Sequence, residues 1–180
     1  MRGQVWIETV IYTLIGISLI GLVLAFVTPK INEAKDKALV EQSIATLGAL
    51  DEKINNVIES GSGNIRIVEV TLKKGILSIN ESKDEIWFVL NDLNKPYSEP
   101  NVVIDSFGDI KIKSIKGAKT SSTYIYTKYE SVDIVYEGGD ADDDKSFGAS
   151  PSPYRISIEH KGVAGEEPNR KTIISLKEVS

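Results

Sequence analysis

Three aspartates in one polar stretch have the alternating spacing that begins a calcium-binding loop: Asp140, Asp142 and Asp144. A full EF-hand loop of this kind also needs glycine at its sixth position and glutamate at its twelfth. Lys145 and Pro151 occupy those positions, so an EF-hand is excluded. Two interpretations remain, a looser calcium site of carboxylates and backbone carbonyls or a solvated acidic loop, and the composition favours the loop.

Few other residues carry recognisable chemistry. Asn80-Glu81-Ser82 is the one N-glycosylation sequon, in a predicted turn, and Asn80 is an acceptor candidate if this part of the chain lies outside the cell. His160 is the single histidine, and without metal-ligand spacing around it we expect a surface or turn residue. No pattern of a nucleophile, a phosphate-binding loop or an acid–base pair stands out. We therefore expect no enzyme and no cofactor.

Four tyrosines lie close together in the sequence, at positions 124, 126, 129 and 136. They are compatible with a binding stripe. Aromatic residues also fit half-buried pleated surfaces, so ordinary strand positions are the favoured interpretation.

The charge balance limits the classes of partner. The 180 residues contain 26 acidic and 21 basic side chains, for a formal net charge of −5. A nucleic-acid-binding surface needs a basic patch, so we expect no nucleic-acid partner. The chain has no cysteine, which excludes disulfides, thiolate metal sites and a cysteine nucleophile.

The first thirty residues form the segment around which the rest of the chain must be arranged. From Thr9 to Val27 there is no charged side chain, and this run is about long enough to cross a bilayer as a helix. Gly16 and Gly21 lie within it and are candidates for close helix–helix contacts. Glu8 is a carboxylate immediately ahead of the run. No A-x-A-like cleavage site follows, so we expect the run to be retained in the mature protein.

A long helix over residues 4–59 is predicted, with an apolar half at 5–28 and an amphipathic half at 30–59. Pro29 separates the halves and should kink or locally open the helix. In the second half, apolar residues recur at steps of three and four, which predicts one buried stripe. Its members are Val40, Ile44, Leu47, Ile54 and Val57 or Ile58, with Leu50 nearby.

The pattern of residues 64–180 predicts a β-rich head. Short alternating runs predict an antiparallel sandwich or a strongly curved sheet, and the whole chain is therefore α+β. Residues 86–90, apolar on both faces, are the candidate central strand, and the chain should end in a hairpin. An exposed acidic loop is expected over 138–153. Strands are expected at 65–72 (with a slip or bulge near Val68), 76–79, 86–90, 102–105, 110–115, 123–129, 132–136, 154–159 and 172–177.

The N-terminal residues carry a family resemblance. Arg2-Gly3-Gln4, with Glu8 as the fifth residue counted from Gln4 and a long apolar helix after it, resembles archaeal type IV pilin-like proteins with class III signal peptides. Trp6 stands where that family often has a serine. The resemblance covers about the first thirty residues. The remaining chain shares only the layout of a long helix followed by a β-rich head.

The resemblance implies a structural subunit of a cell-surface filament. A prepilin peptidase would remove residues 1–3 by cutting between Gly3 and Gln4. Glu8 would then meet the new amino terminus of Gln4 on a neighbouring subunit and set the register of assembly. The partners would be copies of this chain, the membrane, the peptidase and the pilus assembly machinery. The subunit would lie in the cell membrane before assembly and in an extracellular filament afterwards.

Two alternatives stay open. One is a minor pilin or a pseudopilin-like assembly or secretion component, which the sequence barely separates from a major pilin. The other is an extracellular binding domain on a single membrane helix that never polymerises. The amphipathic half of the helix argues mildly against a simple anchor, because an anchor does not need that length.

Overall fold

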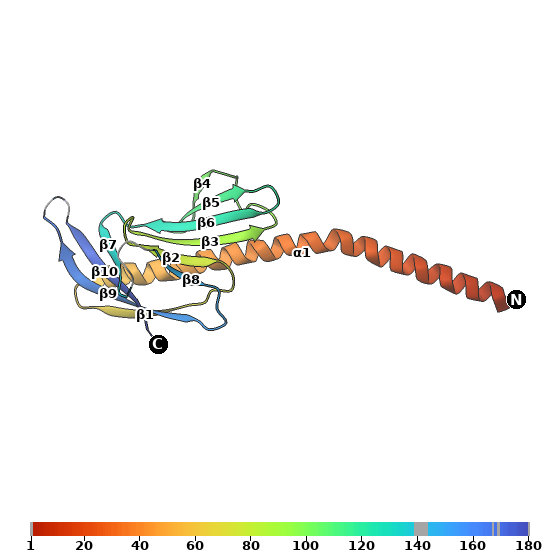
Figure 1. Ribbon diagram of the computed structural model, residues 1–180, viewed down its shortest axis with the longest axis horizontal. Coiled ribbons are helices and arrows are strands. Elements are labelled where there is room, and N and C mark those ends of the chain that lie inside the picture. The colour runs from red at the N-terminus through yellow and green to blue at the C-terminus, as the bar shows by residue number, and fades with distance from the viewer. Residues whose placement is uncertain (1, 139–143, 167, 169, 180) are drawn as a thin grey trace.

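The computed structural model describes residues 2–138, 144–166, 168 and 170–179, with side chains described from Trp6 onward. Within these ranges the chain forms one helix and then strands (Figure 1). The elements are α1 Arg2–Ser60, β1 Ile65–Val70, β2 Ile76–Asn80, β3 Glu85–Leu93, β4 Val103–Asp105, β5 Lys111–Lys116, β6 Ser121–Lys128, β7 Val132–Tyr136, β8 Lys145–Gly148, β9 Tyr154–Ala164 and β10 Lys171–Glu178.

The second half of α1 packs on the head through the predicted apolar stripe. Its fully buried members recur at steps of three, four or seven, as one face of a helix requires. They are Val40, Leu47, Leu50, Ile54 and Val57, with Ile44 and Ile58 partly buried beside them. The helix stops at Gly61, whose φ of +82° is the left-handed conformation that glycine adopts at helix ends. The amphipathic helix and its end are thus confirmed.

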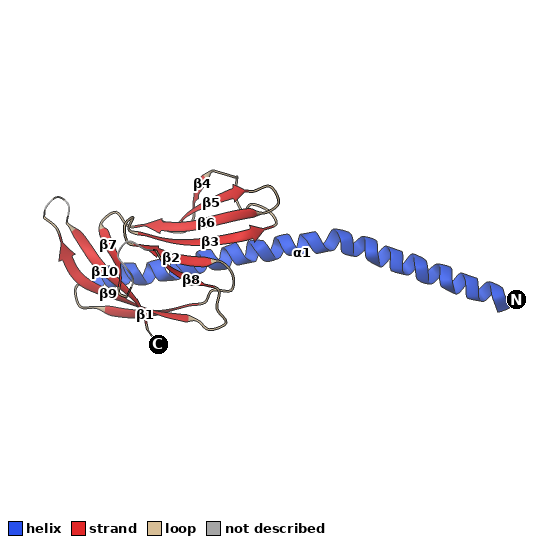
Figure 2. Ribbon diagram, viewed as in Figure 1, coloured by secondary structure: helices blue, strands red, loops and turns tan. Residues whose placement is uncertain are grey.

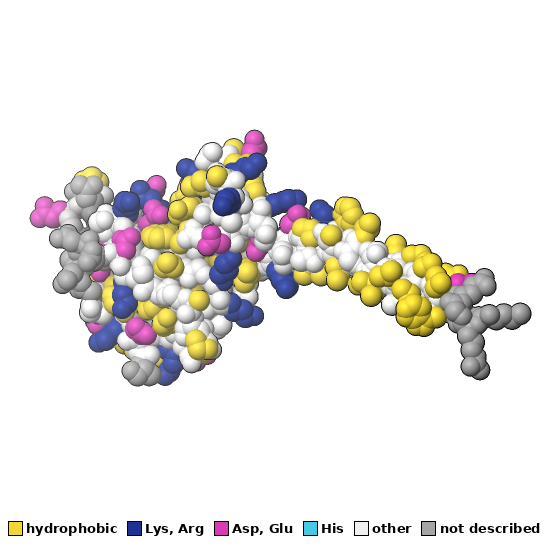
Figure 3. All heavy atoms as spheres, turned by 45° about the vertical axis from the view of Figure 1, so that its right-hand side comes forward, with side chains coloured by type: hydrophobic (Ala, Val, Ile, Leu, Met, Phe, Trp, Pro, Cys, Tyr) yellow, Lys and Arg dark blue, Asp and Glu magenta, His cyan; other side chains and the backbone are white. Residues whose placement is uncertain are grey.

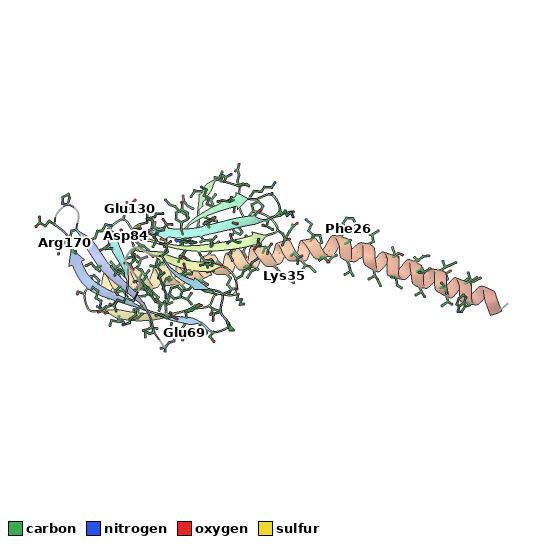
Figure 4. All side chains as sticks on the ribbon, in the orientation of Figure 1. Phe26, Lys35, Glu69, Asp84, Glu130 and Arg170 are labelled. Atoms are coloured by element: carbon green, nitrogen blue, oxygen red, sulfur yellow. The ribbon has the colours of Figure 1, made fainter. Side chains whose placement is uncertain are left out.

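Pro29 lies inside α1, and the helix continues through it. Proline has no N–H to donate to the carbonyl four residues earlier, and its ring crowds that carbonyl. Figure 1 shows α1 bending between the free half and the half that enters the head. Phe26 lies beside this bend (Figure 4). The bend falls where the sequence predicts a kink.

Six strands form the larger sheet, in the order β4-β5-β6-β3-β2-β8, with antiparallel pairing throughout. β3 is an interior strand, as predicted from its two apolar faces. Ile86, Phe88 and Leu90 are buried on the side that faces the core. The alternate residues of β3, including Trp87, lie on the outer face.

Four strands form the smaller sheet, in the order β1-β9-β10-β7. β9 and β10 make the predicted terminal hairpin. β7 and β10 pair in parallel, which corrects the expectation of a wholly antiparallel head. The reason is topological. β10 turns back from β9 and pairs on its other side with β7, which lies well before it in the sequence, and no local pattern encodes the relative direction of two such strands.

The helix contacts both sheets, through β3 and β6 of one and β1, β9 and β10 of the other. In Figure 2 the two sheets curve around this half of α1. The chain is therefore an α+β protein with a sandwich-like head whose core includes the helix.

One predicted loop is partly wrong. The sequence predicts an exposed loop over 138–153, but β8 lies within this range and pairs with β2. Phe147 is 2% exposed and packs edge-on against Tyr136 and Tyr154, with ring centroids 6.1 and 5.1 Å away. A single apolar residue between serine and glycine gives no alternation to detect, which explains the miss.

Candidate functional site

The free half of α1 exposes apolar side chains on every face, and Figure 3 shows it as a stalk of hydrophobic atoms. The exposed set runs from Trp6, 71% exposed, to Ile31, 47% exposed. None of its apolar window is buried, and by length and composition it can cross a membrane. A soluble monomer seldom exposes an apolar surface of this extent, so lipid or other protein must cover it.

The polar groups of this half suit an apolar environment. The Thr13 hydroxyl donates to the carbonyl of Thr9 and the Ser18 hydroxyl to that of Leu14, each at 2.8 Å. These bonds satisfy the hydroxyls within the helix, as a medium without water requires. Glu8 is the exception, since it is exposed and makes no ion pair or hydrogen bond with the side chains that the structure describes. A carboxylate at the edge of such a segment needs water or a cationic partner.

The predicted processing and packing residues lie along this half. Gly3 and Gln4 are in the first turn of α1, outside the residues whose side chains are described. A methyl group added at Gly16 or Gly21 would meet no atom within 4 Å beyond the adjoining backbone of the helix itself. At about 100° per residue the two glycines point about 140° apart. They cannot serve one shared contact, so each faces a different side of the helix.

A polar clamp joins the helix to the head just after Pro29. The Lys95 ammonium lies 2.7 Å from the Glu33 carboxylate. The backbone and side-chain nitrogens of Asn94 both donate to Asp36 at 2.7 Å. The hydrogen bond from Lys95 lowers the pKa of Glu33 below its ordinary value, although desolvation opposes it. This contact between residues far apart in sequence carried no signal that sequence reasoning could use.

A second polar contact lies deeper along the helix. The Tyr129 hydroxyl donates to Asp51 at 2.7 Å, and Asn55 donates to the same carboxylate at 3.1 Å. Burial raises the pKa of Asp51 most strongly, and the charge of Asp109 raises it further, against the lowering effect of both hydrogen bonds. Burial also raises the pKa of Tyr129, with the Asp51 carboxylate adding to the rise. The contact fixes the helix against the end of β6.

Of the three residues of the calcium candidate, only Asp144 lies within the described part of the chain. Asp140 and Asp142 lie outside it. Asp144 accepts a hydrogen bond from the side-chain amide of Asn80. Within the described part of the chain, no group of three or more potential metal-ligating side chains comes together.

His160 corrects the expectation of a surface or turn residue. It is 5% exposed in β9, and its Nδ1 accepts a hydrogen bond from the backbone N–H of Gly162 at 3.0 Å. A usable signal was present, because His160 continues the inward alternation of Ile156 and Ile158. It is a buried residue of the β9–β10 hairpin, beside the register shift between Ile173 and Ile174.

The four tyrosines divide into two pairs. Tyr129 and Tyr136 are buried, 8% and 6% exposed. Tyr124 and Tyr126 are half-buried on the outer face of β6, where sequence reasoning missed their neighbour Trp87. Of the four tyrosines of the candidate binding stripe, only Tyr124 and Tyr126 remain at the surface, and Trp87 lies beside them there.

No family model, no curated protein and no solved structure matches this chain. Its class therefore follows from its own fold, a β-rich α+β head built on a long helix whose free half can cross a membrane.

Proposed function

We propose that this protein is a pilin, the structural subunit of a type IV pilus-like filament on an archaeal cell surface. The observation that carries the proposal is the division of α1 at Pro29. One half contributes an apolar stripe to the core of the head, and the other exposes apolar side chains all around its circumference. In a filament, copies of the free half pack together and the heads form the outer surface.

The same segment then serves two environments in turn. Before assembly it holds the subunit in the cell membrane, because its surface is as apolar as lipid. After assembly the neighbouring helices replace the lipid. Gly16 and Gly21 face different sides of the helix, so each allows a different neighbouring helix to pack closely.

Glu8 is the residue that gives assembly a register. Cleavage between Gly3 and Gln4 by a prepilin peptidase creates an amino terminus at Gln4. The ammonium of one subunit then pairs with the Glu8 carboxylate of the next. Leaving that carboxylate unpaired among apolar helices costs several kcal/mol, which selects the aligned arrangement.

The N-terminus of the native protein tests the proposal. A tryptic digest of the protein from its own membranes or surface fraction gives a peptide spanning 4–30 if the leader is removed. An unprocessed chain gives a peptide spanning 3–30, because trypsin cuts after Arg2. We expect the shorter peptide, and the longer one alone would refute processing and the Glu8 pairing with it.

Assembly is tested separately with Glu8→Ala and Glu8→Gln, which remove the charge at two side-chain sizes. Both variants should leave the membrane-held subunit folded and strongly reduce sheared filaments. Leu22→Ile, a volume-conserving change in the same exposed half, is the matched control and should assemble normally. Normal filaments from both Glu8 variants would contradict the register role.

A membrane-anchored binding domain is the second candidate, favoured by the aromatic surface around Trp87. It predicts an intact N-terminus and no filament. A minor pilin or pseudopilin-like component shares the processing of a major pilin and is recognised by its low abundance in sheared filaments.

A further inference from the structure

The outer face of the larger sheet carries an aromatic surface formed by Trp87, Tyr124 and Tyr126. Trp87 pairs across the strands with Tyr126, and its ring centroid lies 6.5 Å from that of Tyr124 at a tilt of 35°. A cavity of about 230 Å³ lies over these rings. Its volume suits one sugar-sized group rather than a peptide segment.

The rim of this cavity is polar and includes the sequon. Besides the three rings, the cavity is lined by Asn80, Lys83, Glu85 and Asp144. Asn80 lies opposite Glu85 across β2 and β3, so Trp87 is its diagonal neighbour on the same face. Diagonal neighbours in an antiparallel pair are about 7–8 Å apart, so a sugar attached to the Asn80 amide can reach the ring of Trp87. The acceptor asparagine and the aromatic surface are therefore one unit.

The turn already holds the Asn80 amide in a fixed direction. Its carbonyl oxygen accepts hydrogen bonds from the backbone N–H of Lys83 at 2.8 Å and from the Ser82 hydroxyl at 2.9 Å. Its nitrogen donates to Asp144. A glycosylated amide keeps one N–H, so one donor remains for Asp144 after modification.

We propose that Asn80 is N-glycosylated and that its first sugar lies on the surface of Trp87, Tyr124 and Tyr126. The C–H bonds on one face of a pyranose pack on the negative face of an aromatic ring. The sugar hydroxyls then reach Glu85 and Lys83, which offer an acceptor and a donor at the rim. The occupant of the cavity is thus a glycan of the same chain.

The modification is a group transfer from a lipid-linked oligosaccharide, in which phosphate is the leaving group. The Asn80 nitrogen forms a bond to the anomeric carbon as the bond from that carbon to the phosphate oxygen breaks. The phosphate leaves with the electron pair, and the amide gives up one proton to solvent. The transfer takes place while the Asn80 side chain is accessible to the transferase, and the attached sugar packs on the aromatic rings afterwards.

This inference rests on the proposed function for one point, that the head lies outside the cell. The same tryptic digest of native protein tests both the processing before Gln4 and the modification of Asn80. Trypsin cuts after Lys74 and Lys83, so Asn80 is carried by the peptide spanning 75–83. We expect this peptide to bear a glycan. An unmodified peptide from chains that start at Gln4 would overturn the inference and leave the filament proposal standing.

The contact between glycan and rings is tested by a double-mutant cycle in the native host. Ser82→Thr keeps the sequon and Ser82→Ala removes it. In the wild-type background, the unglycosylated variant should melt about 2–4 °C below the glycosylated one. With Trp87→Ala, or with Tyr126→Thr as a second variant in case the first fails to fold, the difference should shrink to less than half. An equal difference in all backgrounds would refute the aromatic site.

Discussion

Leu47→Ala tests whether the helix is part of the head. Leu47 is completely buried in the stripe that α1 presents to both sheets. Removing a buried leucine side chain costs about 3 kcal/mol, because the lost apolar transfer is joined by the cavity left behind. For a chain of this size that cost lowers the melting temperature by about 6–12 °C.

The assay uses the full chain in detergent, with Trp6→Phe as the background so that Trp87 alone reports fluorescence. Trp87 lies in the interior strand β3, and its emission follows unfolding of the head. Denaturant and thermal unfolding are recorded for each variant. Leu22→Ala is the matched control, since Leu22 is in the same helix but 58% exposed, and it should leave the unfolding of the head unchanged.

Equal unfolding of the Leu47 and Leu22 variants would refute the reasoning. It would mean that the head is stable without the helix and that α1 is only an anchor. The anchored binding domain would then be the better explanation of the whole chain.

Three further predictions follow from contacts in the head. The pKa of Asp51 is raised from 3.8, so its ionisation destabilises the fold as the pH rises from 3.8 through the folded pKa. Asp51→Asn should therefore unfold at a higher urea concentration than wild type at neutral pH. In acid the difference between the two should vanish. The pKa of Glu33 is lowered from 4.5, so the stability it contributes is present above 4.5 and lost as the pH falls through the folded pKa. Lys95→Ala should reduce that acid-side loss in urea titrations at a series of pH values, because Lys30 still lowers the pKa of Glu33. Gly75 has a φ of +91°, and an added methyl carbon would lie 2.4 Å from the carbonyl oxygen of Val89, so Gly75→Ala should cost on the order of 3 kcal/mol, read from the urea midpoint.

The elements that sequence reasoning recovered are those with a strong local period. The stripe from Val40 to Val57 repeats at helical spacing, and β3 is a continuous apolar run between turns. Both patterns lie within one element and need no partner to be recognised. The glycine end of the helix and the terminal hairpin are equally local.

What escaped prediction depends on pairing between distant parts of the chain. β8 is recognisable only through its partner β2, and the parallel direction of β10 is set by β7. The clamp of Glu33 with Lys95 joins residues that no short motif connects. Trp87 was assigned to a strand, but its place beside Tyr124 and Tyr126 depends on the register of β3 with β6. Register is a property of the folded sheet and not of either strand alone.

The continuity of α1 through Pro29 has a mechanical consequence. No flexible linker separates the stalk from the head, so in the filament proposed above a pull would reach the head core directly through the helix backbone. The apolar stripe and the clamp at Asp36 would take that force along the helix axis, in shear, where many contacts must yield at once. A head tethered by a loose chain would instead open one contact at a time. The bend beside Phe26 would straighten under such a pull before the buried contacts of the head yield.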